Sequence, residues 1–585
     1  MRTLMRLLIV ALVLAVMAPG TAQAAPRVII KGGGWGHGIG MSQYGTYGRA
    51  QRGDGAKQII EHYYSGANVS ERNMPKIRVG LLQSQSEIVL SGKPFRSGDG
   101  LIVFTLRDRK IVKGGQNATF RIVPSPTGGL RIYKNGDVVK RDGRRVFGSS
   151  KRHIQVHYQQ HDSRVYVHDK STAYAYGHLE IDTYQTNSCN PGFCARLVIK
   201  MPMQKYVYGL GEVPASWPQA ALQTQAIAGR TYAFEKISRL GQHRYPCDCA
   251  VYDSVIDQAY IGDSKRTGSG SYWDDWKRAV NRTNDKVILH NGSPIQALYS
   301  SSSGGHTEHN ENVWGGTPLP YLRGVPDGPD DNSANPNYKW RVGMSWRSFE
   351  NKLQAAYNIG NLRRFRLIRP FGVSGRVTVV RGDEGGAKVV GSRRVARVDG
   401  WSLRSSLGLK DTLFRVTFRY ERASTFDQKY SRLDGAPGDA VSDPYDVPKR
   451  ADTALGAAQD FERGRMTRVS SSDIVTWQWG RILKRYDDLR RERGRLGMPS
   501  SDVHGAPGTR RAYYDNGALY QNPETRTVFA LWGVIADGYV EAGETTSVCG
   551  FPTSDVVTTE TGRTASFEHG VIEWVKGTGL SVDCA

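Results

Sequence analysis

The last part of the chain repeats itself with a period of 53 residues. Without a gap, this interval separates Phe461, Tyr514 and Phe567; Gly464, Gly517 and Gly570; Trp479 and Trp532; Tyr486 and Tyr539; and the segments Leu496–Pro499 and Cys549–Pro552. The third copy stops after Trp574, as an end cap would. Bulky and Gly/Pro positions in one register require each copy to form the same small unit, so we predict a repeat module over residues 456–585.

The first 24 residues have the layout of a secretory signal peptide. Arg2 and Arg6 precede an apolar run from Leu7 to Val16, and Ala22-Gln23-Ala24 offers a small-residue cleavage site. No later stretch reaches the roughly 18 to 20 apolar residues that a bilayer crossing requires. We therefore expect a secreted protein that is either soluble or wall-bound and has no membrane span after cleavage.

The remaining chain is long enough for several domains, because single hydrophobic cores stop growing beyond roughly 250 to 300 residues. Residues 424–455 are rich in Asp, Pro, Gly and Ser and lack hydrophobic periodicity, which indicates a linker. A degenerate first repeat around Leu433–Pro437 is a weaker alternative for part of this segment. The predicted order is signal peptide 1–24, main domain 25–423, linker 424–455 and repeat module 456–585.

The charge distribution favours anionic partners for the main domain. The chain has 79 Lys and Arg against 55 Asp and Glu, whereas residues 456–585 have 15 basic and 17 acidic side chains. The net charge of +24, or +22 without the two signal arginines, therefore lies before residue 456. A basic secreted domain suits polyanions such as phosphate-bearing wall polymers, and it would bind nucleic acid only nonspecifically. The alternative is that this charge serves solubility alone.

Six cysteines in an oxidising compartment indicate disulfides. They are grouped as Cys189/Cys194, Cys247/Cys249 and Cys549/Cys584, so we expect one local disulfide in each region. An alternative for the middle pair is a zinc site with His243, although the spacing does not match a standard finger.

Alternating apolar residues predict many short strands and few helices. The fold class expected is therefore α+β with a dominant sheet, and residues 98–182 are expected to form a β-rich elaboration beside the main domain. The predicted strands are Ile77–Leu82, Leu101–Leu106, Phe120–Pro124, Arg164–Asp169 and Leu179–Thr183, and the predicted helices are Ala56–Tyr64, Trp217–Ile237 and Trp346–Tyr357.

A well-marked helix start follows Glu212. Ser216 and Gln219 have the spacing of a capping box, and Pro218 falls in the expected first turn. Leu222, Ala226, Gly229 and Ala233 then recur at helical spacing as one thin face. Glu212 lies on the preceding loop among apolar neighbours, which would raise its carboxyl pKa, whereas the helix N-terminus would lower it. We take Glu212 as the candidate catalytic acid.

The repeats resemble the LGFP repeats of actinobacterial wall-associated proteins, notably in residues 513–543 (YYDNGALYQNPETRTVFALWGVIADGYVEAG). This resemblance implies a cell-wall binding module. The aromatic residues would also be explained if they only form the core of each repeat.

Four further segments resemble the SpoIID/LytB family and cover most of residues 30–420: Gly34–Gly66, Lys76–Gly92, Lys205–Phe234 and Ala297–Val325. The family includes lytic transglycosylases that cut peptidoglycan glycan strands and proteins described as enhancers of wall amidases. The resemblance thus implies a SpoIID-like domain that acts on the cell wall, and the partners it implies are peptidoglycan for an enzyme and a wall amidase for an enhancer.

The chain departs from the family pattern in two ways. The GHGxGMSQ segment usually comes last, whereas here it opens the mature chain and Ser402–Tyr420 ends the domain. Such an order looks like a circular permutation, and it predicts that Arg27–Lys31 packs beside the strand Leu413–Phe418. In the helix, Gln223 stands where the family often has lysine, so any role of a cation there is lost or moved.

Breaking the bond after N-acetylmuramic acid needs a proton on the departing oxygen and stabilisation of an oxocarbenium-like sugar. A hydrolase usually needs two carboxylates, but a lytic transglycosylase manages with one, because the 6-hydroxyl of the sugar attacks and leaves a 1,6-anhydro end. Glu212 would act as acid and then as base, and no cofactor is predicted.

Four more residues are candidates for substrate binding. By the resemblance, Arg230 fixes the substrate or the ionised acid, and Tyr299 and Tyr44 line the glycan groove. His37, in the glycine-rich segment, is a candidate donor to a sugar hydroxyl. Each also has a purely structural explanation. Arg230 could be an ordinary charge on a helix face, the two tyrosines could pack in the core, and His37 could serve a tight turn.

Other chemistries are not supported. The glycines of GGGWGHGIG lack phosphate-loop spacing and more simply allow tight turns. Ser300–Ser303 lack a GxSxG elbow and suggest a hydrogen-bonded turn, and HExxH is missing. Two alternatives to the enzyme remain: a noncatalytic amidase enhancer, which the Gln223 departure favours, and a wall-anchoring protein, which leaves the motifs unexplained.

Overall fold

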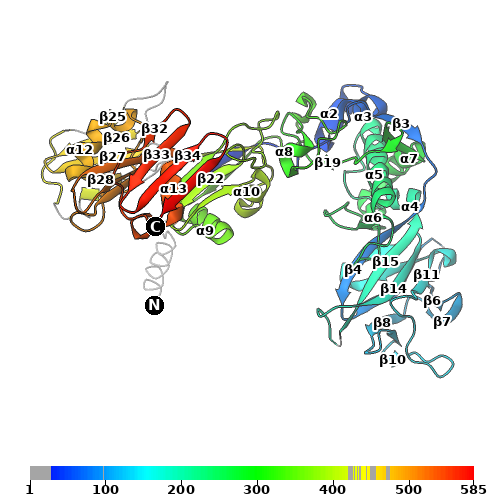
Figure 1. Cartoon of the computed structure of the whole chain (residues 1–585). Helices are drawn as coiled ribbons and strands as arrows, with labels where there is room; N and C mark the ends of the chain where they lie inside the picture. Colours follow the sequence, from blue (N-terminus) through cyan, green and yellow to red (C-terminus); the bar gives the residue numbers. More distant parts are fainter. Residues whose placement is uncertain are drawn as a thin grey trace, which may run out of the picture. The chain divides into compact units, whose positions relative to one another are not determined.

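The computed structural model describes residues 28–418 except 97 and 191, residues 456–469 and 475–585, and the short stretches 426, 429–430, 433, 436–442 and 445–447. The predicted signal peptide lies outside these residues. The chain forms two compact units (Figure 1). We call Gly33–Lys339 with Gly372–Arg376 the motif unit, and Met1–Gly32, Trp340–Phe371 and Val377–Ala585 the repeat unit. The predicted main domain 25–423 therefore contributes to both.

Two large sheets form much of the motif unit, and their inward side chains share one hydrophobic core. The seven-stranded sheet has the order β16-β4-β15-β14-β11-β6-β7, with strands β4 (Lys76–Gln85), β6 (Ile102–Leu106), β7 (Arg109–Gly114), β11 (Ile154–His157), β14 (His178–Gln185), β15 (Phe193–Pro202) and β16 (Val251–Tyr252). The six-stranded sheet has the order β10-β9-β8-β5-β12-β13, with strands β5 (Ile88–Pro94), β8 (Thr119–Pro124), β9 (Leu130–Lys134), β10 (Asp137–Val138), β12 (Ser163–Val167) and β13 (Thr172–Tyr174).

The five predicted strands are present with small shifts at their ends. Strands of the predicted elaboration 98–182 pair directly with strands outside it, β14 with β15 and β12 with β5. This β-rich segment is therefore continuous with the sheets of the motif unit.

Two of the three predicted helices lie in the motif unit, as α3 and α5, and the third lies in the repeat unit. The helices of the motif unit are α2 (Gln43–Gln51), α3 (Ala56–Tyr63), α4 (Met203–Tyr208), α5 (Gln219–Leu240), α6 (Ser264–Ser269), α7 (Trp273–Arg282) and α8 (Asn310–Trp314). Two small sheets accompany them, β18 (Ser293–Pro294)-β17 (Lys286–His290)-β3 (Asn68–Glu71) and β19 (Tyr299–Ser300)-β2 (Met41–Ser42).

Helix α5 buries its predicted face, because Leu222, Ala226, Gly229 and Ala233 are all buried. The predicted capping box is wrong. Pro218 is the N-cap residue and provides no side-chain cap, while the Gln219 Nε2 donates to the Asp275 carbonyl of α7 (2.9 Å). The helix start is therefore fixed by packing against α7.

In the repeat unit, β1 (Val28–Gly32) lies between β20 (Trp340–Met344) and β24 (Phe414–Phe418), antiparallel to both. Val28 is opposite Phe418 and Gly32 is opposite Phe414, which confirms the predicted pairing of this segment with Leu413–Phe418 over the described residues. The neighbouring elements are α9 (Trp346–Tyr357), β21 (Leu362–Leu367), β22 (Ala387–Gly391), β23 (Val395–Val398) and α10 (Gly400–Leu407).

Residues 53 apart occupy equivalent places in the rest of this unit. Phe461, Tyr514 and Phe567 each pair with the glycine three positions on, closing a hairpin. The elements are β26 (Gly456–Phe461), β27 (Gly464–Val469), β28 (Val475–Trp479) and α12 (Gly480–Asp488); β29 (Arg511–Tyr514), β30 (Gly517–Gln521), β31 (Val528–Trp532) and α13 (Gly533–Ala542); and β32 (Val557–Thr558), β33 (Gly562–Phe567), β34 (Gly570–Val575) and β35 (Gly579–Cys584).

Parts of the segment predicted as a linker join the first of these sheets. Tyr445–Val447 forms β25 and pairs with β26, and Phe426 packs in the same cluster as Phe461. Composition alone did not indicate this pairing because the strand has only three residues.

Among the described residues, none of the helices combines the length and apolarity needed to span a membrane.

Candidate active site around Glu212

Glu212 lies on the loop between α4 and α5, and this loop is paired with residues 258–261. The Gly211 N–H donates to the Ala259 carbonyl (2.8 Å), and the Ile261 N–H donates to the Gly209 carbonyl (2.9 Å). In return, the Ala259 N–H donates to Oε1 of Glu212 (2.6 Å). The partly buried carboxyl group is therefore held in one position by backbone.

A chain of side-chain hydrogen bonds ends at the same carboxylate. The Tyr206 hydroxyl donates to Oε1 of Gln258 (2.9 Å), and Nε2 of Gln258 donates to the Tyr299 hydroxyl (2.8 Å). Tyr299 is also hydrogen-bonded to Glu212. Because the Tyr299 oxygen accepts from Gln258, its single proton points to Glu212. The candidate tyrosine is thus a direct partner of the candidate acid.

Burial raises the pKa of Glu212 above its ordinary value. Hydrogen bonds from Ala259, Tyr299 and Gln43 and the charge of Lys265 act in the opposite direction. None of these strongest influences within the described chain is a second carboxylate. Glu212 is thus a partly buried carboxyl group with a raised pKa and no carboxylate among the strongest influences on it.

Lys265 of α6 supplies a cation beside this loop. Its side chain is buried, Nζ donates to the Val213 carbonyl (2.5 Å), and Nζ lies 4.9 Å from the centre of the Trp276 ring. Burial lowers the pKa of Lys265 to about 8, and the charge of Glu212 opposes that change. The cation that the sequence lacks at Gln223 is thus present near Glu212 from a different helix.

Three of the motif segments meet at Glu212. Gln43, the last residue of the GMSQ motif, donates through Nε2 to the Glu212 main-chain carbonyl and to Gln225 Oε1 (both 3.3 Å). Tyr299 reaches the site because β19 pairs in parallel with β2, next to Gln43. The fold thus brings together Gln43, Glu212 and Tyr299, which are more than 80 positions apart in the sequence.

The glycine-rich segment is a close-packed turn, as predicted. Gly38 has a φ of +70°, and a Cβ there would lie 2.2 Å from Cζ of Arg376. The buried guanidinium of Arg376 donates to the His306 and Ser303 carbonyls (both 2.8 Å). The glycines thus admit an arginine that ties this turn to the Ala297–Val325 segment.

His37 is partly exposed on this turn. Its Nδ1 accepts from the Ile39 N–H (3.0 Å), and its ring lies 5.0 Å from that of Trp314. Trp314 and Trp35 are exposed by 47% and 48%. The backbone of Trp35 pairs with Ser302, three residues after Tyr299. His37 therefore packs with the exposed Trp314 on this turn. Its predicted contact with a sugar hydroxyl stays a prediction.

Tyr44 is partly buried, and its ring packs at a tilt against that of Trp217, with 5.3 Å between ring centres. The Tyr47 ring lies 5.2 Å from the same Trp217 ring. Burial raises the pKa of Tyr44. Tyr44 thus holds the start of α5, and the structure shows no direct contact of its side chain with Glu212 among the described residues.

Arg230 lies in the core, whereas its predicted role was to fix the substrate or the ionised acid. Its side chain is completely buried, and it donates to the Lys286 carbonyl of β17 (3.0 Å) and to Oε1 of Gln204 (3.1 Å). Burial lowers its pKa to about 10. Arg230 therefore joins α5 to β17 and α4 in the core.

The serine run forms the predicted hydrogen-bonded turn. The Ser302 hydroxyl donates to Asp330 and the Ser303 hydroxyl to Asp327 (both 2.7 Å). Tyr63 also donates to Asp327 (2.7 Å), whose pKa is raised to about 6 by burial and by the charge of Asp330. These serines are held as donors, which does not suit a nucleophile.

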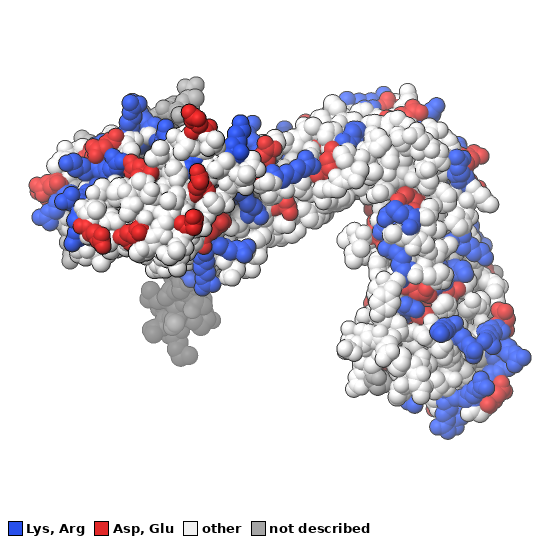
Figure 2. All heavy atoms as spheres, viewed as in Figure 1, with Lys and Arg blue, Asp and Glu red and all other residues white. Residues whose placement is uncertain are grey.

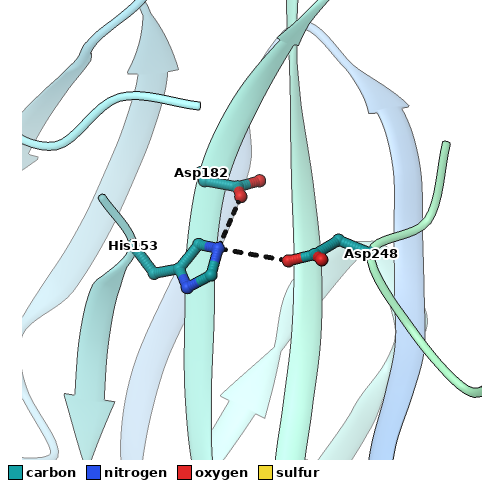
Figure 3. Close-up of side chains that lie close together, drawn as sticks. All are labelled: His153, Asp182 and Asp248. Carbon is teal, nitrogen blue, oxygen red and sulfur yellow. Dashed lines mark ion pairs between the residues drawn. The ribbon is translucent and has the colours of Figure 1, made fainter. Parts of the chain in front are cut away.

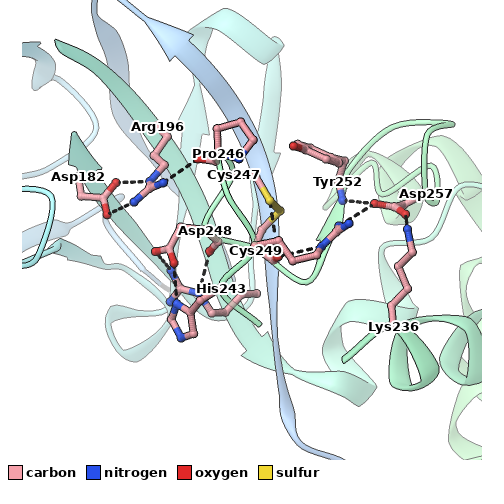
Figure 4. The surroundings of a disulfide bond; sticks show 12 residues. Asp182, Arg196, Lys236, His243, Pro246, Cys247, Asp248, Cys249, Tyr252 and Asp257 are labelled. Carbon is pink, nitrogen blue, oxygen red and sulfur yellow. Dashed lines mark hydrogen bonds and ion pairs between the residues drawn. A yellow bond between two sulfur atoms is a disulfide. The ribbon is translucent and has the colours of Figure 1, made fainter. Parts of the chain in front are cut away.

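The three expected disulfides are formed: Cys189–Cys194, Cys247–Cys249 and Cys549–Cys584. The alternative zinc site fails because Cys247 and Cys249 are bonded to each other. His243 instead contacts Asp248 through Nδ1 (2.6 Å), and Asp248 lies between the two cysteines (Figure 4).

Asp248 belongs to a buried ion-pair network around His153. Nε2 of His153 lies 2.9 Å from Asp182 and 3.1 Å from Asp248 (Figure 3). These three residues could coordinate a cation by their spacing. However, Arg78 pairs with Asp248 (2.6 Å) and Arg196 with Asp182 (2.5 Å), so their charges are already neutralised. Hydrogen bonds to Asp182 and Asp248 raise the pKa of His153 to about 9, so His153 is itself the cation of this cluster.

The His153 network should make folding stability depend on pH. A folded pKa near 9 lies above the unfolded value of about 6.5, so the stabilisation is complete below pH 6.5 and disappears as the pH rises through 9. We expect His153→Gln to lower the free energy of unfolding by about 3 kcal/mol at pH 6 and much less at pH 10. Denaturant titrations of both proteins measure this difference, and an equal loss at both pH values would contradict the assignment.

Two residues at the site, Gln258 and Lys265, were missed by the sequence analysis. Both belong to residues 253–269, a stretch without a recognised motif. A buried lysine looks like any surface lysine in a sequence, so no local signal would have found it.

Comparisons with known proteins identify the part of the chain that holds this site. Residues 195–290, which include Glu212, Gln258 and Lys265, match the SpoIID family, described as stage II sporulation protein. The chain is 34% identical over 141 residues to the amidase enhancer of Bacillus subtilis (24% of this chain and 17% of that protein).

It is also 31% identical over 163 residues to stage II sporulation protein D of Bacillus subtilis (27% and 47% of the two chains), and 29% identical over 163 residues to the protein of that name from Bacillus amyloliquefaciens (27% and 46%). The chain thus spans less than half the length of each of these relatives. The segment around Glu212 is similar to SpoIID domains.

Proposed function

We propose that this protein is a secreted, cell-wall-associated lytic transglycosylase that cleaves peptidoglycan glycan strands and leaves 1,6-anhydro-N-acetylmuramic ends. The observation that carries this proposal is the single Glu212 carboxyl, with a pKa raised by burial and fixed contacts to the Ala259 N–H and the Tyr299 hydroxyl. The similarity of residues 195–290 to SpoIID domains supports a role at the cell wall.

In the proposed reaction, protonated Glu212 donates its proton to the glycosidic oxygen as the bond from that oxygen to the anomeric carbon breaks. The resulting carboxylate takes the proton of the 6-hydroxyl, whose oxygen forms the new bond to the anomeric carbon. Glu212 ends protonated and no water is consumed. One carboxyl therefore suffices.

Tyr299 is proposed to position Glu212 and tune its pKa. Its hydrogen bond lowers that pKa, so Tyr299→Phe should raise it and move the alkaline limb of the pH–rate profile to higher pH. The loss of one hydrogen bond to a charged group, about 1.5 to 3 kcal/mol, predicts a rate about 10 to 100 times lower.

Tyr64→Phe is the matched control, because the Tyr64 hydroxyl donates to the neighbouring Leu298 carbonyl (2.9 Å) and has no bond to Glu212. Its pH–rate profile should coincide with that of the wild type. An unchanged alkaline limb in Tyr299→Phe would contradict the role given to this tyrosine.

The second candidate function is a noncatalytic amidase enhancer, which the similarity to a relative of that name favours. Incubating purified glycan strands with the protein and weighing the products by mass spectrometry separates the two. New anhydro ends support the transglycosylase. Intact strands, together with faster cleavage by an added wall amidase, would replace it with the enhancer.

The repeats 456–585 are proposed to bind the cell wall, and their resemblance to LGFP repeats supports this. Full-length Glu212→Gln protein should still sediment with purified wall sacculi, since its repeats are unchanged. Failure to sediment would contradict wall binding without bearing on Glu212.

A further inference from the structure

Residues 93–152 of the motif unit carry a concentration of positive charge that the proposed reaction does not use. They contain 15 Lys and Arg and only 4 Asp and Glu, and so supply eleven of the chain's 24 net positive charges. They also lie outside the segment 195–290 that is similar to SpoIID domains. We call these fifteen side chains the basic surface: Lys93, Arg96, Arg107, Arg109, Lys110, Lys113, Arg121, Arg131, Lys134, Lys140, Arg141, Arg144, Arg145, Lys151 and Arg152.

The basic surface faces solvent and is not neutralised within the described chain. All of its residues are exposed except Lys134 and Arg141, which are partly buried. Only Arg121 and Arg141 have a described carboxylate within ion-pair distance, Glu87 at 3.2 Å and Asp142 at 3.6 Å. The remaining charges therefore repel one another without compensation.

Two loops concentrate these charges. The Arg141 guanidinium donates to the Lys110 carbonyl, so the loop 140–145 lies against the β6–β7 hairpin. Arg109 precedes Lys110 in the hairpin, and the Arg144 backbone pairs with that of Arg141, so both flank this contact. Figure 2 shows Lys and Arg side chains gathered over β6, β7 and β10.

The adjoining sheet face continues the surface. Arg121 of β8 and Arg131 of β9 both point outward, because their neighbours Phe120, Ile122 and Ile132 are buried. The Arg121 guanidinium lies 4.3 Å above the Tyr133 ring. Such stacking holds the guanidinium in place, while one of its edge nitrogens pairs with Glu87.

The composition of the surface points to a phosphate polymer. Nine of its fifteen residues are arginines, whose planar donors match phosphate oxygens in pairs. Among the described residues 93–152, no large apolar side chain is exposed, whereas insertion into a membrane surface requires one. A long polyanion would relieve the repulsion along the whole surface at once.

We propose that the basic surface binds a linear polymer with one phosphodiester charge per repeating unit, and so holds the protein on anionic wall polymers. This role is independent of Glu212.

Binding of the full-length protein to long-chain inorganic polyphosphate, followed at several salt concentrations, tests this proposal. The test variant is Arg107→Gln/Arg109→Gln/Arg144→Gln/Arg145→Gln. The control Arg481→Gln/Lys484→Gln/Arg490→Gln/Arg493→Gln removes the same charge from exposed positions of the repeat unit. The test variant should bind at least ten times more weakly, with a slope of log K against log salt reduced by up to about 3. The control should remain within about twofold of the wild type.

Unchanged binding by the test variant, or an equal loss in both variants, would overturn the proposal. Wild-type protein that binds vesicles of anionic phospholipid but not polyphosphate would overturn it in favour of a lipid surface. Should the four-residue variant fail to fold, Arg144→Glu/Arg145→Glu tests the same loop and should also weaken binding at least tenfold.

Discussion

Glu212→Gln should slow the cleavage of glycan strands by at least about a thousandfold, within the range expected for loss of a general acid. Glutamine keeps an oxygen that accepts the Ala259 N–H, and it keeps the size of the side chain, so the loop should stay in place. It has no proton to give to the glycosidic oxygen and no charge to take one from the 6-hydroxyl. Both proposed steps would therefore fail together.

Glu61→Gln provides the matched control, because it makes the same change on α3, where the Glu61 side chain is 43% exposed and lies 3.7 Å from Lys57. Its cleavage rate should stay within about threefold of the wild type, as expected for a surface substitution. Equal product from Glu212→Gln and the wild type would remove Glu212 from the mechanism.

The second large effect concerns stability. Arg78→Met should lower the free energy of unfolding by about 3 to 5 kcal/mol, because removing one partner leaves buried charges uncompensated. Arg78 pairs with Glu180 and Asp248, and all three are largely buried. Burial alone would raise the pKa of Glu180, but hydrogen bonds from His178 and Arg78 and the charge of Arg78 lower it to about 2. Without Arg78, the buried negative charge of Glu180 would lose its main compensation at neutral pH. The unfolded chain, in which this carboxylate is hydrated, would then be favoured.

Arg121→Met is the control for this experiment, since the Arg121–Glu87 pair is about half exposed on both sides. A loss below about 1 kcal/mol is expected there. Urea denaturation measures the free energy of unfolding of both variants and of the wild type. If the two losses were equal, the network around His153 would not be the stabilising feature we take it to be.

Glu212 and Tyr299 were both named from motif segments of the sequence, and the structure brings these two side chains into contact. Their roles in catalysis stay predictions. The loop before α5 pairs with residues 258–261, and the β2–β19 pair joins two motif segments. The three disulfides were predictable because cysteines close in the sequence leave few pairings. The hairpins 53 residues apart follow from the repeated Phe/Tyr and Gly positions.

Arg230 shows that a position in a motif segment does not by itself place a side chain at the site. Its helical position was clear, but α5 is buried around most of its circumference, so a charged residue on it faces the core. Lys265 and Gln258 were missed because their role depends on a tertiary contact with the Glu212 loop. The His153 network was also invisible, since its members come from separate strands and loops and share no spacing pattern.

The central claim is that one carboxyl transfers a proton in both directions and that the sugar itself supplies the attacking oxygen. Cleavage of glycan strands in water enriched in heavy oxygen tests this directly. The account predicts new ends that carry no heavy oxygen and are lighter by one water than hydrolytic ends. Heavy oxygen at the new ends, or strands that remain uncut, would contradict it.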